Sequence, residues 1–392
     1  MDELIKNVVN DTIKWRRDLH QIPEVGQELP KTSEYVCSQL DSMGIEYRKN
    51  VGLPSAIVAT LEGTKSGGGK TIALRADMDG LPIAEETNLP FASKNGAMHA
   101  CGHDAHTAIL LGTIKVLNQM KDQFSGKVKF LFQPAEEISA GAQPMIEAGC
   151  LEGVDAIIGL HVGNISNSGA AGTAIFSKGS MMACLDRWTL KVNGVGSHGA
   201  YPHESHDTIV MAGHIISAIQ EIISRELNPV DPGVITVGIV KGGSAYNIIP
   251  DCVYMEGTAR AVKQDTREYI SERIGSIAKN IANAFRGDVE YEYIFGAPPL
   301  VNDDEFTDKV IESAKKAIGE ENILLMESPV MGGEDFAYYL EKVPGTFIFL
   351  STPLAIDGVF YPHHNSKFAI DEQYFDRAIA IFVQSAIDFL NN

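Results

Sequence analysis

Apolar and polar residues recur with two different periods along the chain, and these periods predict alternating helices and strands. Apolar residues at helical spacing indicate helices over 3–19, 31–43 and 106–120. Short apolar runs indicate strands over 55–61, 71–76, 127–133 and 155–161. The last of these strands is apolar throughout, which is typical of a strand buried in a parallel sheet.

The middle of the chain has a different pattern. Alternation of apolar and polar residues over 187–193 predicts a strand with one solvated face. The elements predicted after it are a helix over 207–227, strands over 233–240 and 252–261, a helix over 266–285 and a strand over 288–295. The order is βαββαβ, the split βαβ arrangement of a small ferredoxin-like domain.

The first pattern resumes after residue 300, with a helix over 303–318, a strand over 346–351 and a final helix from 372. We therefore predict the fold class α/β, with a discontinuous α/β domain and an inserted βαββαβ domain. The predicted boundaries are 1–184 and 297–392 for the two segments of the α/β domain and 185–296 for the insertion.

Composition supports two domains and narrows the partners. A chain of 392 residues exceeds what one hydrophobic core usually holds. The net charge of −19 argues against nucleic acid and anionic membranes as partners, since both attract clustered cations. No apolar run is long enough to span a membrane. The first residues lack a secretory signal, and five scattered cysteines indicate a reducing compartment, so we expect a cytoplasmic protein.

Side chains that bind metals gather where the predicted strands end. The strand over 71–76 leads to Asp77 and Asp79, the strand over 127–133 to Glu136 and Glu137, and the strand over 155–161 ends at His161. Further candidates lie in the segment H-A-C-G-H-D-A-H (99–106), before a predicted helix, and at the histidine pair 363–364. Because ligands of open α/β sheets bind beyond the carboxyl ends of the strands, we expect these segments to meet.

The number of candidate ligands favours two ions. A catalytic metal needs about three protein ligands and an open position. Cys101, His103, His161, one of the paired glutamates and one late histidine exceed that number, and they suit two ions about 3.5–4 Å apart. The residues alone do not decide which glutamate binds metal and which one moves protons. A nucleophilic Cys101 thiolate is the alternative reading of the same segment.

Two loops of the inserted domain carry neutral polar groups, at 196–206 and 242–251. Both are rich in glycine and proline, so ordinary turn chemistry explains them equally well. The functional reading is that a lid supplies hydrogen-bond donors to the substrate.

A set of motifs in one order resembles the aminoacylase and hippurate hydrolase branch of the metal-dependent amidohydrolase and carboxypeptidase family. That branch includes N-acyl-amino-acid hydrolases, auxin-conjugate hydrolases and N-acetyl-diaminopimelate deacetylases. The motifs are D-M-D-G-L-P, H-A-C-G-H-D-A-H, F-Q-P-A-E-E, G-L-H, S-H-G-A-Y-P-H, N-I-I-P-D, G-T-A-R, M-G-G-E-D-F-A and the late histidine pair.

The resemblance assigns roles that the residues alone leave open. It implies that the α/β domain, with segments 1–184 and 297–392, is a catalytic domain with a dinuclear metal site, and that the inserted domain is a lid or dimerisation domain. It also implies that Cys101 bridges two metals and that Glu136 is the general base and acid. The other implied ligands are His103, Glu137, His161 and His364, with His363 as the alternative to His364. It also implies that Asp79 supports the ligands and that three residues of the lid bind substrate, namely His198, Asn247 and Arg260.

These implications predict an enzyme that hydrolyses the amide bond of small N-acyl-L-amino acids. The predicted cofactors are two divalent ions, manganese or zinc, with nickel or cobalt as alternatives. The expected assembly is a homodimer or higher homo-oligomer through the lid. The alternatives are a metallo-dipeptidase or carboxypeptidase with the same residues, and a non-catalytic metal-bound binding protein.

Overall fold

The computed structural model describes residues 1–163 and 169–392, and these form two compact units. Unit 1 comprises Met1–Gly179, Val301–Ser328 and Asp335–Asn392, and unit 2 comprises Ser180–Leu300 and Pro329–Glu334. Unit 1 is therefore built from separated segments of the chain. Residues 329–334, which the sequence analysis placed in the second catalytic segment, belong to unit 2.

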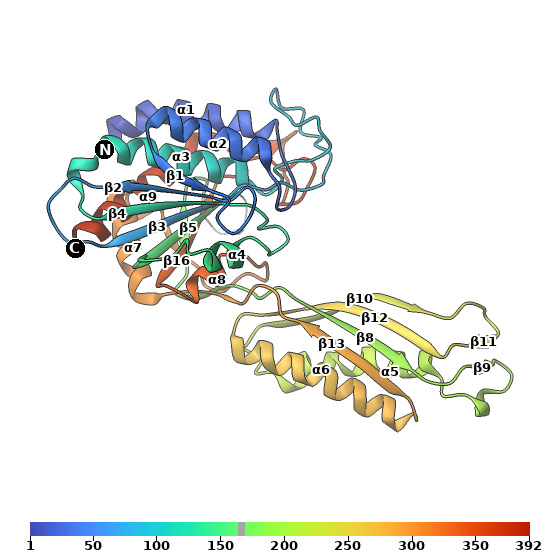
Figure 1. Cartoon of the computed structure of the whole chain (residues 1–392). Helices are drawn as coiled ribbons and strands as arrows, with labels where there is room; N and C mark the ends of the chain where they lie inside the picture. The colour runs from blue at the N-terminus through green and yellow to red at the C-terminus, as the bar shows by residue number, and fades with distance from the viewer. Residues whose placement is uncertain (164–168) are drawn as a thin grey trace. The chain divides into compact units, whose positions relative to one another are not determined.

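Unit 1 is organised around an eight-stranded mixed sheet (Figure 1). In order across the sheet, its strands are β1 (Glu46–Lys49), β2 (Ile57–Glu62), β4 (Lys127–Gln133), β3 (Thr71–Asp77), β5 (Ala156–Gly163), β16 (Gly345–Ser351), β6 (Ala174–Phe176) and β15 (Ile323–Leu325). The four central strands, β4, β3, β5 and β16, are mutually parallel. Their carboxyl ends therefore share one edge of the sheet.

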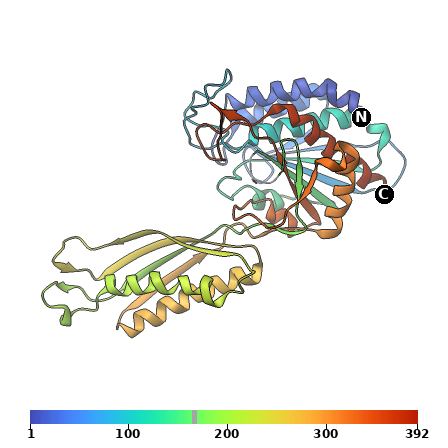
Figure 2. The same cartoon turned by 180° about the vertical axis from the view of Figure 1, so that it is seen from behind.

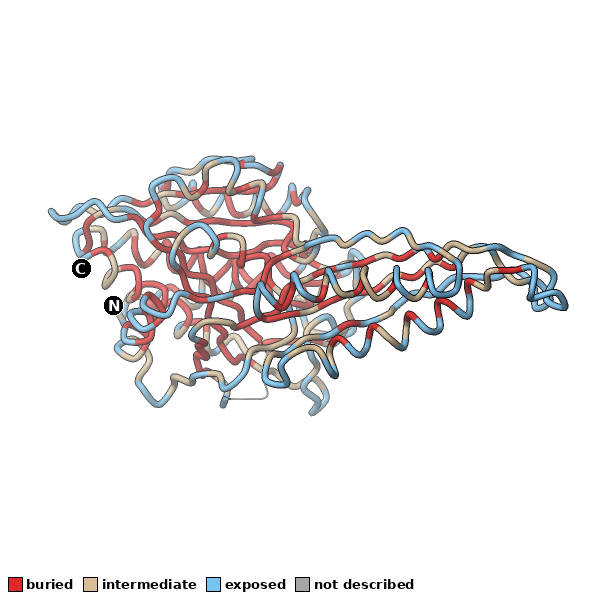
Figure 3. The backbone as a smooth tube through the Cα atoms, turned by 90° about the horizontal axis from the view of Figure 1, so that it is seen from below, coloured by how far each residue is buried: buried red, intermediate tan, exposed pale blue. Residues whose placement is uncertain are grey.

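Helices bury the central strands. The helices α1 (Asp2–His20), α2 (Pro30–Met43), α3 (His103–Gln119) and α9 (Phe375–Asn391) pack in a layer over one face (Figure 1). All seven residues of β3 and all eight of β5 are buried, and buried backbone runs through the middle of this sheet in Figure 3. The remaining elements are α4 (Ala142–Glu147), α7 (Asp304–Ile318), α8 (Ala337–Leu340), β7 (Gly179–Met182), β14 (Leu300–Asn302), β17 (Ala355–Ile356) and β18 (Val359–Phe360).

Unit 2 has the predicted ferredoxin-like order. Its elements are β8 (Asp186–Asn193), α5 (Thr208–Ala218), β10 (Gly233–Gly242), β12 (Cys252–Ala261), α6 (Gln264–Ala284) and β13 (Asp288–Ile294). The antiparallel sheet has the order β10-β12-β8-β13, and both helices lie against one face of it (Figure 2). A short strand pair, β9 (Ser197–His198) with β11 (Ile248–Ile249), extends from this sheet. The predicted fold class is confirmed.

One predicted helix is shorter than its apolar pattern. The helix expected over 207–227 begins after the N-cap Asp207 and ends at Ala218, and a π-helical turn follows over Ile222–Glu226. Ile219 and Ile222 both stay buried, so the apolar stripe continues past the point where regular helical hydrogen bonding ends. The wider turn keeps both side chains in the core, which periodicity alone cannot distinguish from a continuous helix.

None of the helices in the described ranges is long and apolar enough to cross a membrane.

Candidate metal centre

The strand order brings the predicted ligands to one place. From β3 the chain passes through α3 to β4 on one side, and the later strand β5 lies on the other side of β3. The loops at the ends of β3 and β5 therefore diverge, and such a reversal creates a crevice at the carboxyl edge of an open sheet. His161 lies near the end of β5, and His103 begins α3 at this edge.

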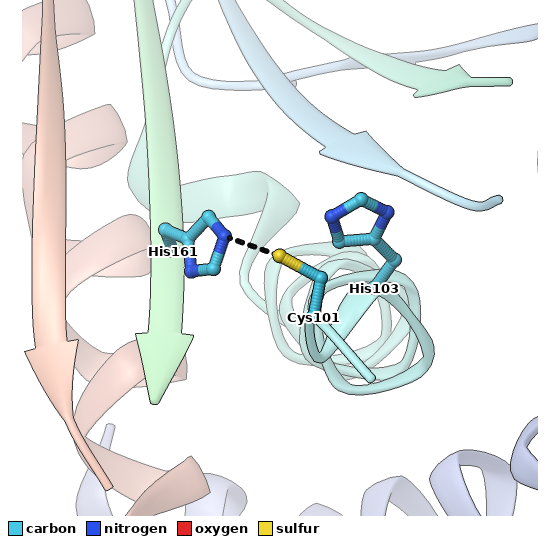
Figure 4. Close-up of side chains that lie close together, drawn as sticks. All are labelled: Cys101, His103 and His161. Carbon is cyan, nitrogen blue, oxygen red and sulfur yellow. Dashed lines mark hydrogen bonds between the residues drawn. The ribbon is translucent and has the colours of Figure 1, made fainter. Parts of the chain in front are cut away.

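The five predicted ligands form two groups that share Cys101. One group is Cys101, His103 and His161, and the other is Cys101, Glu137 and His364, and within each group the ligand atoms lie within 4.8 Å of one another. The Cys101 sulfur lies between the His103 and His161 rings, with its Sγ 3.4 Å from His161 Nε2 (Figure 4). A thiolate shared by two groups is the arrangement that a bridging ligand requires.

Backbone carbonyls orient two of the histidines. His103 Nδ1 lies 2.9 Å from the carbonyl oxygen of Asp79, and His161 Nδ1 lies 2.9 Å from that of Val162. A carbonyl oxygen only accepts, so each Nδ1 carries the hydrogen and each Nε2 faces the group. This is the usual way in which a neighbouring hydrogen bond prepares a histidine to bind a metal.

The charges around His103 favour a cation. Burial disfavours its charged form, yet Asp77 and the hydrogen bond to Asp79 raise the pKa of His103 well above its ordinary value. Its Nε2 has no hydrogen-bond partner among the described residues, and the same is true of Glu137 Oε1. Buried polar atoms without partners are costly, and a metal ion would satisfy both. The residues present therefore fit a dinuclear metal centre.

The environment of Cys101 argues against a free nucleophile. Burial and the nearby Glu137 raise the pKa of the Cys101 thiol to about 12. Reactive cysteines instead lie in surroundings that lower the pKa, because the thiolate is the nucleophile. A cation in the group would provide the missing stabilisation of the thiolate, so the geometry favours a ligand role.

Asp79 holds the two glutamates in place. Its Oδ1 accepts the Glu136 N–H and its Oδ2 accepts the Glu137 N–H, each at 3.1 Å. Just before them, Ala135 has a φ of 63°, a left-handed conformation that is uncommon outside glycine. The turn directs Glu137 Oε2 to within 3.2 Å of His364 Nε2 and Glu136 Oε2 to within 3.8 Å of His103 Nε2.

His363 is also part of the cluster, although the resemblance assigns the ligand role to His364. His363 Nδ1 lies 3.6 Å from Cys101 Sγ, and burial, with the charge of His364, lowers the pKa of His363 to about 3. His364 is more exposed, and its hydrogen bond to Glu137 raises its pKa. Both histidines thus reach the cluster, with only His364 grouped with Cys101 and Glu137.

A buried polar network behind the cluster was not predicted. Arg75 is 1% exposed and donates hydrogen bonds to Asp77 at 2.6 Å, Gln133 at 3.0 Å and Asp335 at 2.9 Å. Asp335 also accepts the backbone N–H groups of Gly141 and Ala142, which follow the glutamate turn. The signal in the sequence was a charged residue, Arg75, inside an otherwise apolar strand, since a buried charge needs partners.

Unit 2 brings together two of the three predicted lid residues. His198 pairs with Ile248 in the β9–β11 ladder, and the Gly199 N–H donates to the Asn247 carbonyl at 2.8 Å, so His198 and Asn247 are neighbours. Arg260 lies apart from them. It is near the carboxyl end of β12, a strand that begins at Cys252, and its Nη1 donates to the Ala259 carbonyl at 2.9 Å.

Comparison with known proteins identifies the family. The model of peptidase family M20/M25/M40 matches residues 73–388. The chain belongs to this family. The match extends over the whole cluster described above, and it confirms the resemblance inferred from the motifs.

Individual relatives span nearly the whole chain. The N-acetyl-L-cysteine deacetylase of Bacillus subtilis is 42% identical over 96% of this chain and 88% of its own, and thermostable carboxypeptidase 1 of Saccharolobus solfataricus is 39% identical over 99% of each. A solved structure described as a dinuclear metal-binding M20 peptidase of Bacillus subtilis has a TM-score of 0.84 at 35% identity, covering 98% of this chain and 99% of its own. The chain is accordingly a metal-dependent hydrolase of the amidohydrolase and carboxypeptidase type.

Proposed function

We propose that the chain hydrolyses the amide bond of N-acyl-L-amino acids, releasing a carboxylate and a free amino acid. The observation that carries the proposal is the Glu136 carboxylate, which is held beside the shared-cysteine groups by Asp79. The relatives include the N-acyl-L-amino acid amidohydrolase of Geobacillus stearothermophilus, 39% identical over 77% of this chain and 80% of its own.

Five side chains would hold two divalent ions, namely Cys101, His103, Glu137, His161 and His364. When bound, the ions polarise the amide carbonyl and lower the pKa of the attacking water. Glu136 accepts a proton from that water on a carboxylate oxygen and returns it to the leaving nitrogen. Asp79 keeps Glu136 in place through the backbone N–H.

The lid residues are proposed substrate contacts. His198 would donate to the oxyanion that forms on the scissile carbonyl, with Asn247 and Arg260 as further predicted contacts. Manganese or zinc is the proposed metal, because thiolate favours zinc while carboxylate and imidazole also accept manganese, nickel or cobalt.

The proposed homodimer or higher homo-oligomer is supported by the open edge of the unit 2 sheet. The edge strand β10 exposes the side chains of Val234, Ile239 and Val240. Unpaired strand edges with apolar side chains are sites of association. Light scattering on protein eluting from a size-exclusion column measures the mass of the assembly, and a mass equal to one chain would contradict the proposed oligomer.

Carboxypeptidase activity is the second candidate. It is favoured by the two thermostable carboxypeptidases of Saccharolobus solfataricus, each 39% identical over 99% of this chain. Both reactions would use the same residues around Cys101, so the difference lies in the substrate.

The deciding experiment is a hydrolysis panel. It compares N-acetyl, N-benzoyl and indole-acetyl amino acids with dipeptides and N-blocked peptides, using protein stripped by chelator and reloaded with manganese, zinc, nickel or cobalt. We expect metal-restored release of amino acids from the N-acyl substrates. Cleavage of peptides alone would establish the second candidate. Full activity in stripped protein would refute a metal mechanism, and no turnover with two ions bound would favour a binding role.

A further inference from the structure

The third histidine of the H-A-C-G-H-D-A-H segment contacts the cluster but is not among its predicted ligands. His106 lies in the first turn of α3 and is 2% exposed. Its ring centroid lies 4.5 Å from that of His161, and the two rings are inclined by 70°. The role of this buried ring can be derived from its two hydrogen bonds.

The two partners fix the tautomer of His106. The Val162 N–H donates to His106 Nε2 at 2.9 Å, and because a backbone N–H only donates, that nitrogen carries no hydrogen. The hydrogen is therefore on Nδ1, which lies 2.6 Å from Asp77 Oδ1 and donates to it. Both ring nitrogens are thus occupied, so His106 has no lone pair to offer a metal, although Asp77, His103 and His106 lie close enough to hold one.

Val162 connects His106 to His161. The ladder between β3 and β5 ends at the pair Arg75 and Gly159, so Val162 lies beyond the last residue that β3 pairs. Val162 pairs with Leu350 of β16 on its other side, and on the β3 side His106 accepts its N–H in place of a strand. The Val162 carbonyl in turn accepts from His161 Nδ1 at 2.9 Å, which leaves His161 Nε2 facing Cys101.

Asp77, on the other side of His106, is itself held in place by Arg75. Asp77 Oδ2 accepts from Arg75 at 2.6 Å, and Arg75 also holds Gln133 and Asp335. Because Arg75 occupies Oδ2, the other oxygen of Asp77, Oδ1, is left to accept the His106 hydrogen.

We propose that His106 is a positioning residue for the metal centre: as its Nδ1–H tautomer, held by Asp77, it fixes Val162 and thereby aims His161 Nε2 at the metal. The proposal rests on the proposed function, since it takes His161 as a ligand. Partners of this kind behind metal ligands typically change metal affinity or activity by about 10–100-fold when they are removed.

Two substitutions separate the two hydrogen bonds of His106. In His106→Asn the side-chain amide can still donate to Asp77 but leaves the Val162 N–H unpaired. In His106→Gln the longer side chain can place its carbonyl oxygen where Nε2 was and accept that N–H. His99→Gln is the matched control, because His99 is 1% exposed and neither ring nitrogen has a hydrogen-bond partner among the described residues.

The experiment measures Co²⁺ binding to protein stripped of metal. Competition with a chelator gives the affinity, and the absorption of a Co²⁺–thiolate bond reports binding at Cys101. We expect His106→Asn to lower the affinity of the protein for one of the two Co²⁺ ions by about 10–100-fold. His106→Gln should restore most of that affinity, and His99→Gln should bind like the wild type. The kcat of the reloaded variants should follow the same order, with KM changed less.

The proposal is overturned if His106→Asn binds Co²⁺ as the wild type does, if His106→Gln is as weak as His106→Asn, or if His99→Gln loses as much. If the variants fail to fold, NMR of wild-type protein labelled with ¹⁵N-histidine decides: a hydrogen on His106 Nε2 overturns the proposal. Wild-type protein that binds Co²⁺ but hydrolyses no amide overturns the proposed function alone, and one that binds no Co²⁺ overturns both.

Discussion

At the scale of single residues, the proposed mechanism assigns different roles to the two adjacent glutamates. Asp79 receives the backbone N–H of each, so both carboxylates are delivered by one turn, but they meet different neighbours. Although burial opposes it, the hydrogen bond from His364 and the charge of His103 lower the pKa of Glu137, as suits a permanent ligand. The proposal assigns the proton transfer to Glu136.

Replacing Glu136 by glutamine tests this division. Glu136→Gln keeps the size of the side chain but removes the proton acceptor, so we expect kcat to fall by about 10²–10⁴-fold. The metal content of the protein, measured by elemental analysis, should stay at the wild-type value. Glu137→Gln is the control and should lose metal as well as activity. A Glu136→Gln variant with nearly normal kcat would remove Glu136 from the mechanism.

The sequence could identify the ligand types but not every partner at this scale. Cys101, His103 and His161 could be predicted as neighbours from the sequence. The first two precede a predicted helix and His161 ends a predicted strand, and both positions lie at the carboxyl edge of a parallel sheet. The choice between Glu136 and Glu137 needed the family resemblance. Asp335 could not be predicted, because its partners Arg75 and Gln133 lie 260 and 202 residues away in the chain.

At the scale of elements, a buried ion pair joins the neighbouring strands β8 and β13 to the helix α6 in unit 2. Arg267 of α6 donates to Asp186 at the start of β8 through two nitrogens, at 2.7 and 2.8 Å, and the side chains are 6% and 0% exposed. The Tyr293 hydroxyl of β13 donates to Asp186 at 2.8 Å, and the Gly296 N–H does so at 3.0 Å. One carboxylate thus joins β8, α6 and β13.

Removing one member of this pair should destabilise unit 2. Arg267→Met leaves the Asp186 carboxylate buried without its cation, and we expect the free energy of unfolding to fall by about 3–5 kcal/mol. Asp186→Asn combined with Arg267→Met should cost clearly less than the sum of the single changes, because the two residues interact directly. Urea unfolding measures all three. Additive losses would show that the pair carries no coupling energy.

Elements were more predictable than their exact ends. The strand 127–133 was predicted with the bounds it has, because Pro134 ends it. The end of α5 at Ala218 was missed, because Ile219 and Ile222 continue the apolar stripe. The periodicity reports which side chains are buried, and it does not report which hydrogen bonds the backbone makes between them.

At the scale of the whole molecule, the chain consists of two units with separate cores, and the two groups around Cys101 lie within unit 1. A ligand that binds only the folded state stabilises it by RT ln(1 + [L]/Kd), about 4 kcal/mol at a thousandfold excess over Kd. Bound metal should therefore stabilise unit 1, while the pair Asp186 and Arg267 stabilises unit 2.

Calorimetry can separate these two effects. We expect two overlapping unfolding transitions, of which chelation lowers the temperature of one and Arg267→Met lowers the other. Reloading manganese or zinc should restore the first transition and the amide hydrolysis together, because both would depend on the proposed ligands Cys101, His103 and Glu137. If chelation and Arg267→Met shift the same single transition, the two units unfold as one cooperative body. The inference that they unfold independently because they have separate cores would then be wrong. If chelation shifts no transition while activity is lost, the metal acts in catalysis without stabilising the fold.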